Sequence, residues 1–227
     1  MKIFEKIDKT FGNLTKKTTK NSNIKSMYDF VGDLNEGLAQ VILKGKYGFI
    51  DKTGKEIIPC KYNNAWIVSD GFIKATLNGK MGLLDKAGKE ICPIKYDSVW
   101  DFGEGLAAVN LNGKWGYIDK TGREICPCKY DYACDFFKGL AQVKLNRKYG
   151  YIDKSGKEVI PCIFDGITYN NQMFYVKFRG KYGCLNQLGD MFVPCIFDIA
   201  PFLEDGKIRM VNDGISAIYN LEGEIIF

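Results

Sequence analysis

The chain has 227 residues, of which 46% are hydrophobic and 26% are charged, a balance typical of a soluble globular protein. It contains no histidine, which excludes Ser-His-Asp and Cys-His catalytic systems and every zinc site that needs an imidazole ligand. The net charge of +5 is concentrated in the first 26 residues, which hold seven lysines against Glu5 and Asp8. A nucleic-acid-binding domain would carry a basic face on its folded body, so we expect no nucleic acid partner.

The first predicted element is a basic amphipathic segment over residues 1–24. Its residues Ile3, Phe4, Ile7, Phe11 and Leu14 lie along one stripe of a 3.6-residue helix. This favours a helix that caps the first repeat, with a membrane-surface helix or a disordered tail as alternatives. The segment lacks the apolar centre of a secretory signal, and no apolar stretch reaches the roughly 20 residues that span a bilayer. We therefore expect a cytoplasmic protein without a membrane span.

A period of 33–34 residues dominates the rest of the chain, from residue 25 to residue 227. A turn glycine and a proline recur with this period, and so does an aromatic residue or methionine followed by glycine. A degenerate sixth pair, Ile215-Ser216, follows one period after the fifth. The five clear pairs, which we interpret as structural repeat positions, are Tyr47-Gly48, Met81-Gly82, Trp115-Gly116, Tyr149-Gly150 and Tyr182-Gly183.

Each period predicts strands rather than helices. A 34-residue period is also that of tetratricopeptide helices, but "LAAVNLNGKWGYIDKTGREI" contains two turn signals within 20 residues. Segments such as "AQVKL" alternate apolar and polar residues, as strands do. Asn112-Gly113 is typical of a type I′ hairpin turn, and "DKTG" of a turn closed by a left-handed glycine. One unit is thus a three-stranded meander plus a loop, and the loop could add a short strand around "SVWDF".

The repeated pattern resembles the bacterial WG-repeat family, also called KWG repeats. The residues that carry it are those of "GLAAVNLNGKWGYIDKTGREICP" and its copies, over about Asn35 to Phe227. The resemblance implies a β-rich repeat array and assigns no activity. We expect an all-β fold of about six units in one domain over residues 25–227. An open superhelical array is favoured, and a closed six-bladed propeller is the alternative.

The eight cysteines fall mainly in two columns of the aligned units. In these columns cysteine exchanges with isoleucine or valine, which predicts small, buried, reduced side chains without metal. Cys126 and Cys128 are two residues apart and are expected to share a face of their strand. Zinc with help from Cys92 and Cys162, or disulfides between units, are the alternatives. The columns are Ile58, Cys92, Cys126, Ile160, Val193 and Cys60, Ile94, Cys128, Cys162, Cys195.

Two further columns have structural interpretations. Asp51, Asp85, Asp119 and Asp153 open the second turn of each unit, and Asn186 and Asn220 take the same place. An Asx-turn needs only the side-chain acceptor, so we interpret this column as a turn rather than as a cation or acid-base site. The repeated glycines are expected to make room for an aromatic ring of a neighbouring unit. Those rings, Trp115 included, are expected to form the core between units.

The connecting loops differ most between units, and this indicates where a partner binds. We expect a non-catalytic scaffold that binds a protein or another macromolecule through these loops. No phosphate-binding glycine loop opens a helix and no nucleophile has an evident base, so we expect neither an enzyme nor a cofactor or metal. The alternative is a cell-wall or glycan-binding module, since the hairpins resemble those of choline-binding repeats. The candidate binding residues are Trp66, Trp100, Phe136, Phe137 and Tyr169.

Overall fold

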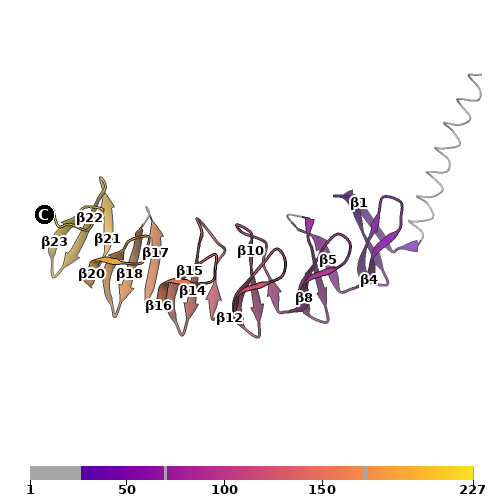
Figure 1. The fold of residues 1–227 in the computed structure, drawn as a ribbon, viewed down its shortest axis with the longest axis horizontal. Coiled ribbons are helices and arrows are strands. Elements are labelled where there is room, and N and C mark those ends of the chain that lie inside the picture. The colour runs from indigo at the N-terminus through magenta and orange to yellow at the C-terminus, as the bar shows by residue number, and fades with distance from the viewer. Residues whose placement is uncertain (1–26, 69–70, 171–172, 227) are drawn as a thin grey trace, which may run out of the picture. The chain divides into compact units, whose positions relative to one another are not determined.

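The computed structural model describes residues 27–68, 71–170 and 173–226, which form β-strands joined by turns (Figure 1). The strands form six antiparallel sheets of three or four strands. This confirms the predicted all-β fold of six repeats. The segment 1–24, with its predicted helix, lies outside the described residues. The chain divides into two compact units, Met1–Asp101 and Phe102–Phe227, and a single domain over residues 25–227 stays a prediction.

The first unit contains two four-stranded sheets, each an antiparallel meander in chain order. The strands of the first sheet are β1 (Phe30–Asn35), β2 (Leu38–Leu43), β3 (Lys46–Asp51) and β4 (Glu56–Tyr62). Those of the second are β5 (Asn64–Ile67), β6 (Ile73–Leu77), β7 (Lys80–Leu84) and β8 (Glu90–Tyr96), and the short strand β9 (Ser98–Val99) follows.

The second unit continues the same meander, and its sheets follow one another in a row from β10 to β23 (Figure 1). It begins with β10 (Leu106–Leu111), β11 (Lys114–Asp119) and β12 (Glu124–Tyr130). The next sheet holds β13 (Tyr132–Ala133), β14 (Leu140–Leu145), β15 (Lys148–Asp153) and β16 (Glu158–Phe164). The last two hold β17 (Gly166–Asn170), β18 (Met173–Phe178), β19 (Lys181–Leu185), β20 (Met191–Phe197), and then β21 (Ile199–Glu204), β22 (Lys207–Asn212) and β23 (Ile215–Tyr219).

The connecting loops supply the first strand of the sheet that follows. Tyr132-Ala133 pairs with β14, where Ala133 lies opposite Val143. The fourth strand that the sequence suggested around "SVWDF" is therefore real, as β9 shows, and most sheets have four strands rather than three. One sheet thus combines the loop that ends one period with the meander that opens the next.

The predicted turns form as the residue types require. Asn112 and Gly113 have φ angles of 54° and 77°, the two positive values that a type I′ turn needs, and Leu111 pairs with Lys114 across it. In the second turn the Gly122 amide donates to the Asp119 carbonyl at 2.9 Å. The Asp119 amide in turn donates to the Arg123 carbonyl at 3.0 Å.

The repeated glycines serve a purpose different from the predicted one. Tyr149 pairs with Phe164 and Tyr151 with Ile160, so two residues of β15 span four of β16. This bulge presses β16 onto Gly150, where a Cβ would lie 2.4 Å from the Ile160 carbonyl oxygen. An added Cβ would likewise lie 2.5–2.7 Å from a carbonyl oxygen of the next strand at Gly48, Gly82, Gly116 and Gly183. The glycines therefore make room for the backbone of their own sheet, and the predicted neighbouring ring is wrong.

The degenerate sixth copy is shifted by one residue from the predicted Ile215-Ser216. Met210 lies opposite Ala217, just as Val176 lies opposite Gly183 in the fifth repeat. Ala217 therefore holds the glycine position. The methyl group is tolerated because only a single bridge, between Tyr219 and Ile225, pairs residues with β23 on this side in the described chain.

The hydrophobic core lies between successive sheets. One cluster joins Tyr151, Ile160 and Phe164 of the β13–β16 sheet to Phe174 and Leu185 of the next. The largest side chains that are buried at equivalent positions of the repeats are aromatic, and each one ends the fourth strand of its meander. Trp115, by contrast, is only half-buried, and Tyr47, Tyr149 and Tyr182 pack at the margins of their clusters. The buried aromatic column comprises Tyr62, Tyr96, Tyr130, Phe164 and Phe197.

The bulge predicts a selective glycine requirement. Gly150→Ala would place a methyl group against the Ile160 carbonyl, and we expect a loss of about 1–3 kcal/mol in unfolding free energy, as for overpacked sites. Gly166→Ala is the matched control, because its nearest contact would be the Lys177 side chain at 3.9 Å. Urea denaturation measures both. Equal effects of the two variants would contradict the bulge as the reason for the glycine.

The burial pattern predicts which aromatic ring stabilises the fold most. Tyr117 is 1% exposed, so Tyr117→Ala should cost about 3–5 kcal/mol, as for a buried aromatic residue. Trp115→Ala should cost clearly less, because the Trp115 side chain is only partly buried. Thermal and urea unfolding of the two variants compare them, and a larger loss for Trp115→Ala would show that the predicted inter-unit core position was right.

Candidate interaction surface

The strands of each sheet turn at two opposite ends, and these ends differ in chemistry. We call the end with the turns between the second and third strands, such as Asn112-Gly113, the hairpin edge. We call the opposite edge, with the Asp-x-x-Gly turns and the turns at Glu36-Gly37, Glu104-Gly105 and Lys138-Gly139, the Asx edge. The two edges alternate because the strands form a meander.

The hairpin edge is engaged in holding successive repeats together. Asp198 accepts from Lys181 Nζ of its own meander at 2.5 Å and from the Asp213 amide of the next at 3.2 Å. Asp165 bridges Lys148 and the Gly180 amide in the same way. The lysine hydrogen bond is the largest cause that lowers the pKa of both carboxyls. An aspartate that follows the buried aromatic residue thus joins one repeat to the next.

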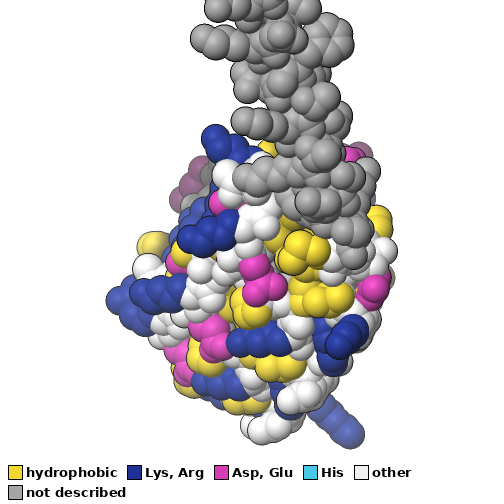
Figure 2. Space-filling view, turned by 90° about the vertical axis from the view of Figure 1, so that its right-hand side faces the viewer, with side chains coloured by type: hydrophobic (Ala, Val, Ile, Leu, Met, Phe, Trp, Pro, Cys, Tyr) yellow, Lys and Arg dark blue, Asp and Glu magenta, His cyan; other side chains and the backbone are white. Residues whose placement is uncertain are grey.

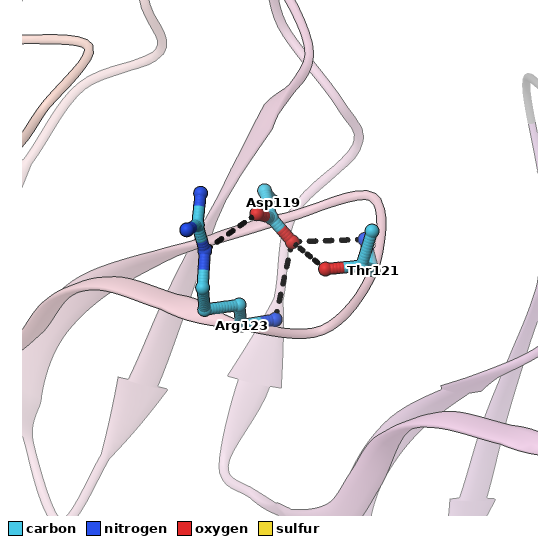
Figure 3. A network of polar contacts seen from close by, with 3 residues as sticks. All are labelled: Asp119, Thr121 and Arg123. Atoms are coloured by element: carbon cyan, nitrogen blue, oxygen red, sulfur yellow. Dashed lines mark hydrogen bonds and ion pairs between the residues drawn. The ribbon is translucent and has the colours of Figure 1, made fainter.

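The aspartates of the Asx edge are held by their own turns (Figure 3). Asp119 Oδ1 accepts from the Thr121 amide at 2.9 Å, from Thr121 Oγ1 at 2.6 Å and from the Arg123 amide at 3.1 Å, while Arg123 Nε donates to Oδ2 at 3.1 Å. Asn186 keeps this role, because its Oδ1 accepts from the Leu188 and Asp190 amides at 2.9 Å. The predicted Asx-turn is confirmed.

The Asx edge also carries ion pairs that cross from one repeat to the next. Glu104 Oε2 accepts from the Gly139 amide at 3.0 Å and lies 2.9 Å from Lys154 Nζ. This lysine hydrogen bond is the main cause that lowers the pKa of Glu104. In the first unit Glu36 forms the same pair with Lys86 at 3.0 Å. The inter-repeat loops are thus fixed where they turn into the next sheet.

A shallow groove of about 600 Å³ lies on the Asx edge of the first unit. Its floor includes Leu38 and Ile57, and its rim is charged. The groove therefore combines an apolar base with both signs of charge, a composition that suits a polypeptide better than a small anion or cation. The charged rim comprises Glu36, Asp51, Lys55, Glu56 and Lys86.

The five predicted binding aromatics occupy different environments. Phe136 is buried and packs edge-on against Tyr117, with ring centroids 4.9 Å apart. Trp66, Trp100 and Tyr169 are half-buried, and Tyr169 packs on Phe174 at 4.8 Å. Phe137 is 64% exposed at the turn into β14. The loops therefore do not form one aromatic cluster within the second unit, and Phe137 is the ring that is offered to solvent.

The two cysteine columns differ in their surroundings. In the fifth repeat Val193 packs toward β22 and β23, whereas Cys195 packs toward β16. The bulge turns residues two apart to opposite faces, so the prediction that Cys126 and Cys128 share a face is wrong. The second column is half-buried rather than buried. Burial raises the pKa of Cys162 to about 11 and that of Cys184 to about 12, which favours the unreactive thiol.

The surface carries both signs of charge. Figure 2 shows Lys and Arg side chains lying among Asp and Glu side chains, with hydrophobic residues between them, over the described part of that face. Within residues 27–68, 71–170 and 173–226, no group of three or more Cys, Asp or Glu side chains is placed to hold a metal ion. In the same part of the chain no helix is long and apolar enough to cross a membrane.

The model of the WG containing repeat matches six consecutive segments of the chain, over residues 18–47, 47–80, 81–115, 115–149, 149–182 and 182–214. No curated protein matches the chain. The AfRom2 CNH domain is similar in structure at 11% identity and a TM-score of 0.36, over 88% of this chain and 84% of that one. Kluyveromyces lactis Hsv2p matches at 12% identity and a TM-score of 0.37, over 84% and 74%.

A third solved structure is the extracellular domain of the one component system BT4673 from B. thetaiotaomicron. It matches at 11% identity and a TM-score of 0.32, over 85% of this chain and 34% of that one. This chain therefore spans about a third of that domain. All three TM-scores are too low to indicate a shared arrangement of repeats.

The Asx-turns predict an acid-sensitive stability. Side-chain hydrogen bonds from Thr53, Thr121 and Ser155 lower the pKa of Asp51, Asp119 and Asp153. A folded-state pKa below the unfolded one contributes stability above the ordinary pKa of about 4, and this stability is lost as the pH falls through the folded pKa. We expect the unfolding free energy to fall from about pH 5 to about pH 2.

The control for this prediction is the double variant Asp119→Asn and Asp153→Asn. It keeps the turn acceptor, as Asn186 does in the fifth repeat, and it removes two titrating groups. Its stability should therefore fall less steeply with acid than that of the natural chain. Urea unfolding at a series of pH values measures both slopes, and parallel slopes would contradict the assignment.

Proposed function

The chain belongs to the WG containing repeat family, and on this basis we propose that it is a non-catalytic scaffold that binds a protein partner through its Asx edge. We further propose that the protein is cytoplasmic and that binding needs no cofactor, metal ion or nucleic acid. The proposal follows from how the two edges are used. The hairpin edge repeats one ion-paired motif, while the Asx edge receives the loops whose sequences differ most.

The contrast between constant strands and variable loops supports this proposal. The hairpin edge keeps its Lys–Asp pair through Lys80–Asp97, Lys114–Asp131, Lys148–Asp165 and Lys181–Asp198. The loops that run toward the Asx edge vary more from one repeat to the next. A rigid array with variable connections presents a distinct surface at each repeat. The four loops read "YNNAWIVSDG", "YDSVWDFGEG", "YDYACDFFKG" and "FDGITYNNQM".

Phe137 is the observation that carries the proposal. Its ring is 64% exposed, and Lys138 Nζ lies 5.4 Å from the ring centroid. Its backbone is fixed, because the Phe137 amide donates to the Leu140 carbonyl at 2.9 Å and the Leu140 amide donates back at 3.2 Å. A large ring on an ordered backbone loses no backbone entropy when a partner covers it, so only side-chain freedom is lost. Aromatic anchors of this kind dominate many protein interfaces.

The other predicted binding residues contribute in different ways. Phe136 belongs to the core and positions the loop rather than contacting a partner. Trp66 is half-buried with Lys74 Nζ 5.8 Å from its ring, and Lys74 is buried and paired with Asp101 at 2.7 Å. Trp66, Trp100 and Tyr169 are half-buried, so only part of each ring is open to a partner. The proposal that the chain is not a catalyst is supported by the recurrent carboxylates. The Oδ1 atom of each accepts three hydrogen bonds within its own turn, at Asp51, Asp119 and Asp153.

The decisive experiment is a quantitative pull-down from lysate of the source cells with three forms of the full chain. The natural chain should enrich a defined protein, and Phe137→Ser should reduce its recovery by at least about tenfold, a size typical of losing one anchor residue. Tyr132→Ser is the matched control, because Tyr132 is a 41% exposed aromatic residue on β13 and not part of the Asx edge turn. It should retain the partner.

Three outcomes separate this proposal from its alternatives. Equal recovery with Phe137→Ser and the natural chain would reject Phe137 as the anchor. Retention on peptidoglycan or on an oligosaccharide array, without a protein partner, would establish the glycan-binding alternative. Turnover of a small substrate would reject both binding functions. Circular dichroism of each variant confirms that the fold is kept.

A further inference from the structure

The Asx edge changes its chemistry between the fourth and the fifth repeat. After the turn glycine, repeats one to four place a basic residue and then a glutamate, and repeats five and six place an acid and then an apolar residue. The register is unchanged, since Ile152 pairs with Glu158 and Leu185 pairs with Met191. The four basic pairs are Lys55-Glu56, Lys89-Glu90, Arg123-Glu124 and Lys157-Glu158, and the two changed pairs are Asp190-Met191 and Glu224-Ile225.

A second position on the same outer strands changes together with the first. Lys129 of β12 lies 3.4 Å from Glu158 of the next sheet, an ion pair between repeats. At the equivalent positions the following repeats hold Ile163 with Met191, and then Ile196 with Ile225. All four apolar side chains are exposed to solvent: Ile163 by 45%, Met191 by 50%, Ile196 by 52% and Ile225 by 67%. An exposed apolar row therefore replaces the ion pair.

The row is continuous across the fifth and sixth repeats. A Cβ on Gly223 would lie 2.6 Å from the Phe192 ring, so the turn of the sixth repeat rests directly on β20. This contact brings the turn that carries Glu224 and Ile225 against the strand that begins with Met191. Single exposed apolar residues are ordinary, but a contiguous row marks an interaction site. Pro161 and Pro194 lie within the edge strands β16 and β20 and lack an amide donor, so a partner docks by its side chains rather than as an added strand.

The row is surrounded by negative charge. From residue 182 to residue 227 the chain has two basic residues and seven acidic ones, a net charge of −5. Five of the acids belong to turns on this edge or follow them directly. Two of them are held by a turn asparagine: Asn186 Nδ2 donates to Asp190 at 3.2 Å, and Asn220 Nδ2 donates to Glu224 at 2.9 Å. The five acids are Asp190, Glu204, Asp205, Glu222 and Glu224.

We infer that this acidic-apolar surface, formed by Ile163, Asp190, Met191, Ile196, Glu224 and Ile225, binds the N-terminal segment of a second copy of the chain. Residues 1–26 carry a net charge of +5, equal and opposite to that of residues 182–227. They also carry the apolar residues Ile3, Phe4, Ile7, Phe11 and Leu14, at spacings that would match an apolar row. A basic apolar sequence and an acidic apolar surface within one chain are complementary in both respects.

The resulting contact is head-to-tail. Because the segment and the surface belong to opposite ends of the chain, each copy offers one donor and one acceptor, and the contact can propagate. Attraction between opposite net charges predicts an association that weakens as salt is added. The inference is independent of the proposed partner at Phe137, which belongs to a different loop.

The test uses a fluorescent peptide of residues 1–26 titrated with the full chain, read by fluorescence anisotropy at low and high salt. The key variant combines Asp190→Lys, Met191→Glu, Glu224→Lys and Ile225→Glu, which restores the residue types found at these positions in repeats one to four. Since those repeats fold with such residues, the fold should be kept. We expect peptide affinity to fall at least about tenfold, with a parallel loss of concentration-dependent mass in sedimentation velocity.

Two controls make the result specific. Asp213→Lys changes the net charge by +2, as the fourfold variant does, but at the hairpin edge, where Lys44 holds the same place in the first repeat. It should leave affinity within about twofold, because charges farther apart than the Debye length are screened. A peptide with the same composition in scrambled order should bind weakly, because its apolar residues no longer form a stripe.

Several results would overturn the inference. They are absence of peptide binding to the natural chain at low salt, equal binding of the natural and scrambled peptides, and unchanged affinity of the fourfold variant. Should the fourfold variant fail to fold, the charge-only variant Asp190→Lys, Glu224→Lys replaces it, with the same expected direction. Equal recovery of the protein partner by Phe137→Ser and by the natural chain, together with intact peptide binding, would reject the proposed function and leave this inference standing.

Discussion

The structure depends on the burial of apolar faces between successive sheets. A single meander has apolar side chains on both faces, as the opposite directions of Val193 and Cys195 show, so it cannot bury them alone. Tyr130, Phe164 and Phe197 fill the space between neighbouring sheets, and each is almost completely buried. Stability therefore arises from neighbouring repeats together, as expected for an array in which each repeat contacts the ones beside it.

The bulge beside each repeated glycine makes this arrangement work. By fitting four residues of β20 against two of β19, it turns Val193 toward one neighbouring sheet and Cys195 toward the other, and β15 and β16 have the same bulge. Only a glycine permits the approach, since a Cβ at Gly150 would meet backbone atoms of β16. The proline in the bulge lacks an amide, so it also removes a donor from an outer strand that would otherwise be free to pair. One glycine and one proline thus give each of the first five repeats both its two-sided burial and its protected edge.

The two edges divide the remaining work. On the hairpin edge Asp198 accepts from Lys181 of its own repeat with one carboxylate oxygen and from the Asp213 amide of the next repeat with the other. On the Asx edge the carboxylate oxygens of Asp119 accept hydrogen bonds from residues of its own turn, and the nearby loops differ in sequence from one repeat to the next. Phe137 stands on this edge with a rigid backbone and an exposed ring. The change from Lys157-Glu158 to Asp190-Met191 shows that the same edge also differs along the chain while the register stays fixed.

The sequence by itself determined the all-β class, the six repeats and both turn types, because these depend on local chemistry. Positive φ at Asn112-Gly113 and the side-chain acceptor of Asp119 act within a few residues, and a 34-residue period reveals them at once. Only the tertiary structure decided which face each strand residue takes and which aromatic rings are buried. The four-against-two bulge breaks the simple alternation of a strand, so Cys126 and Cys128 could not be placed by counting residues. Phe136 and Phe137 look alike in the sequence, but one contacts Tyr117 of the preceding sheet and the other faces solvent, because burial is set by residues far away along the chain.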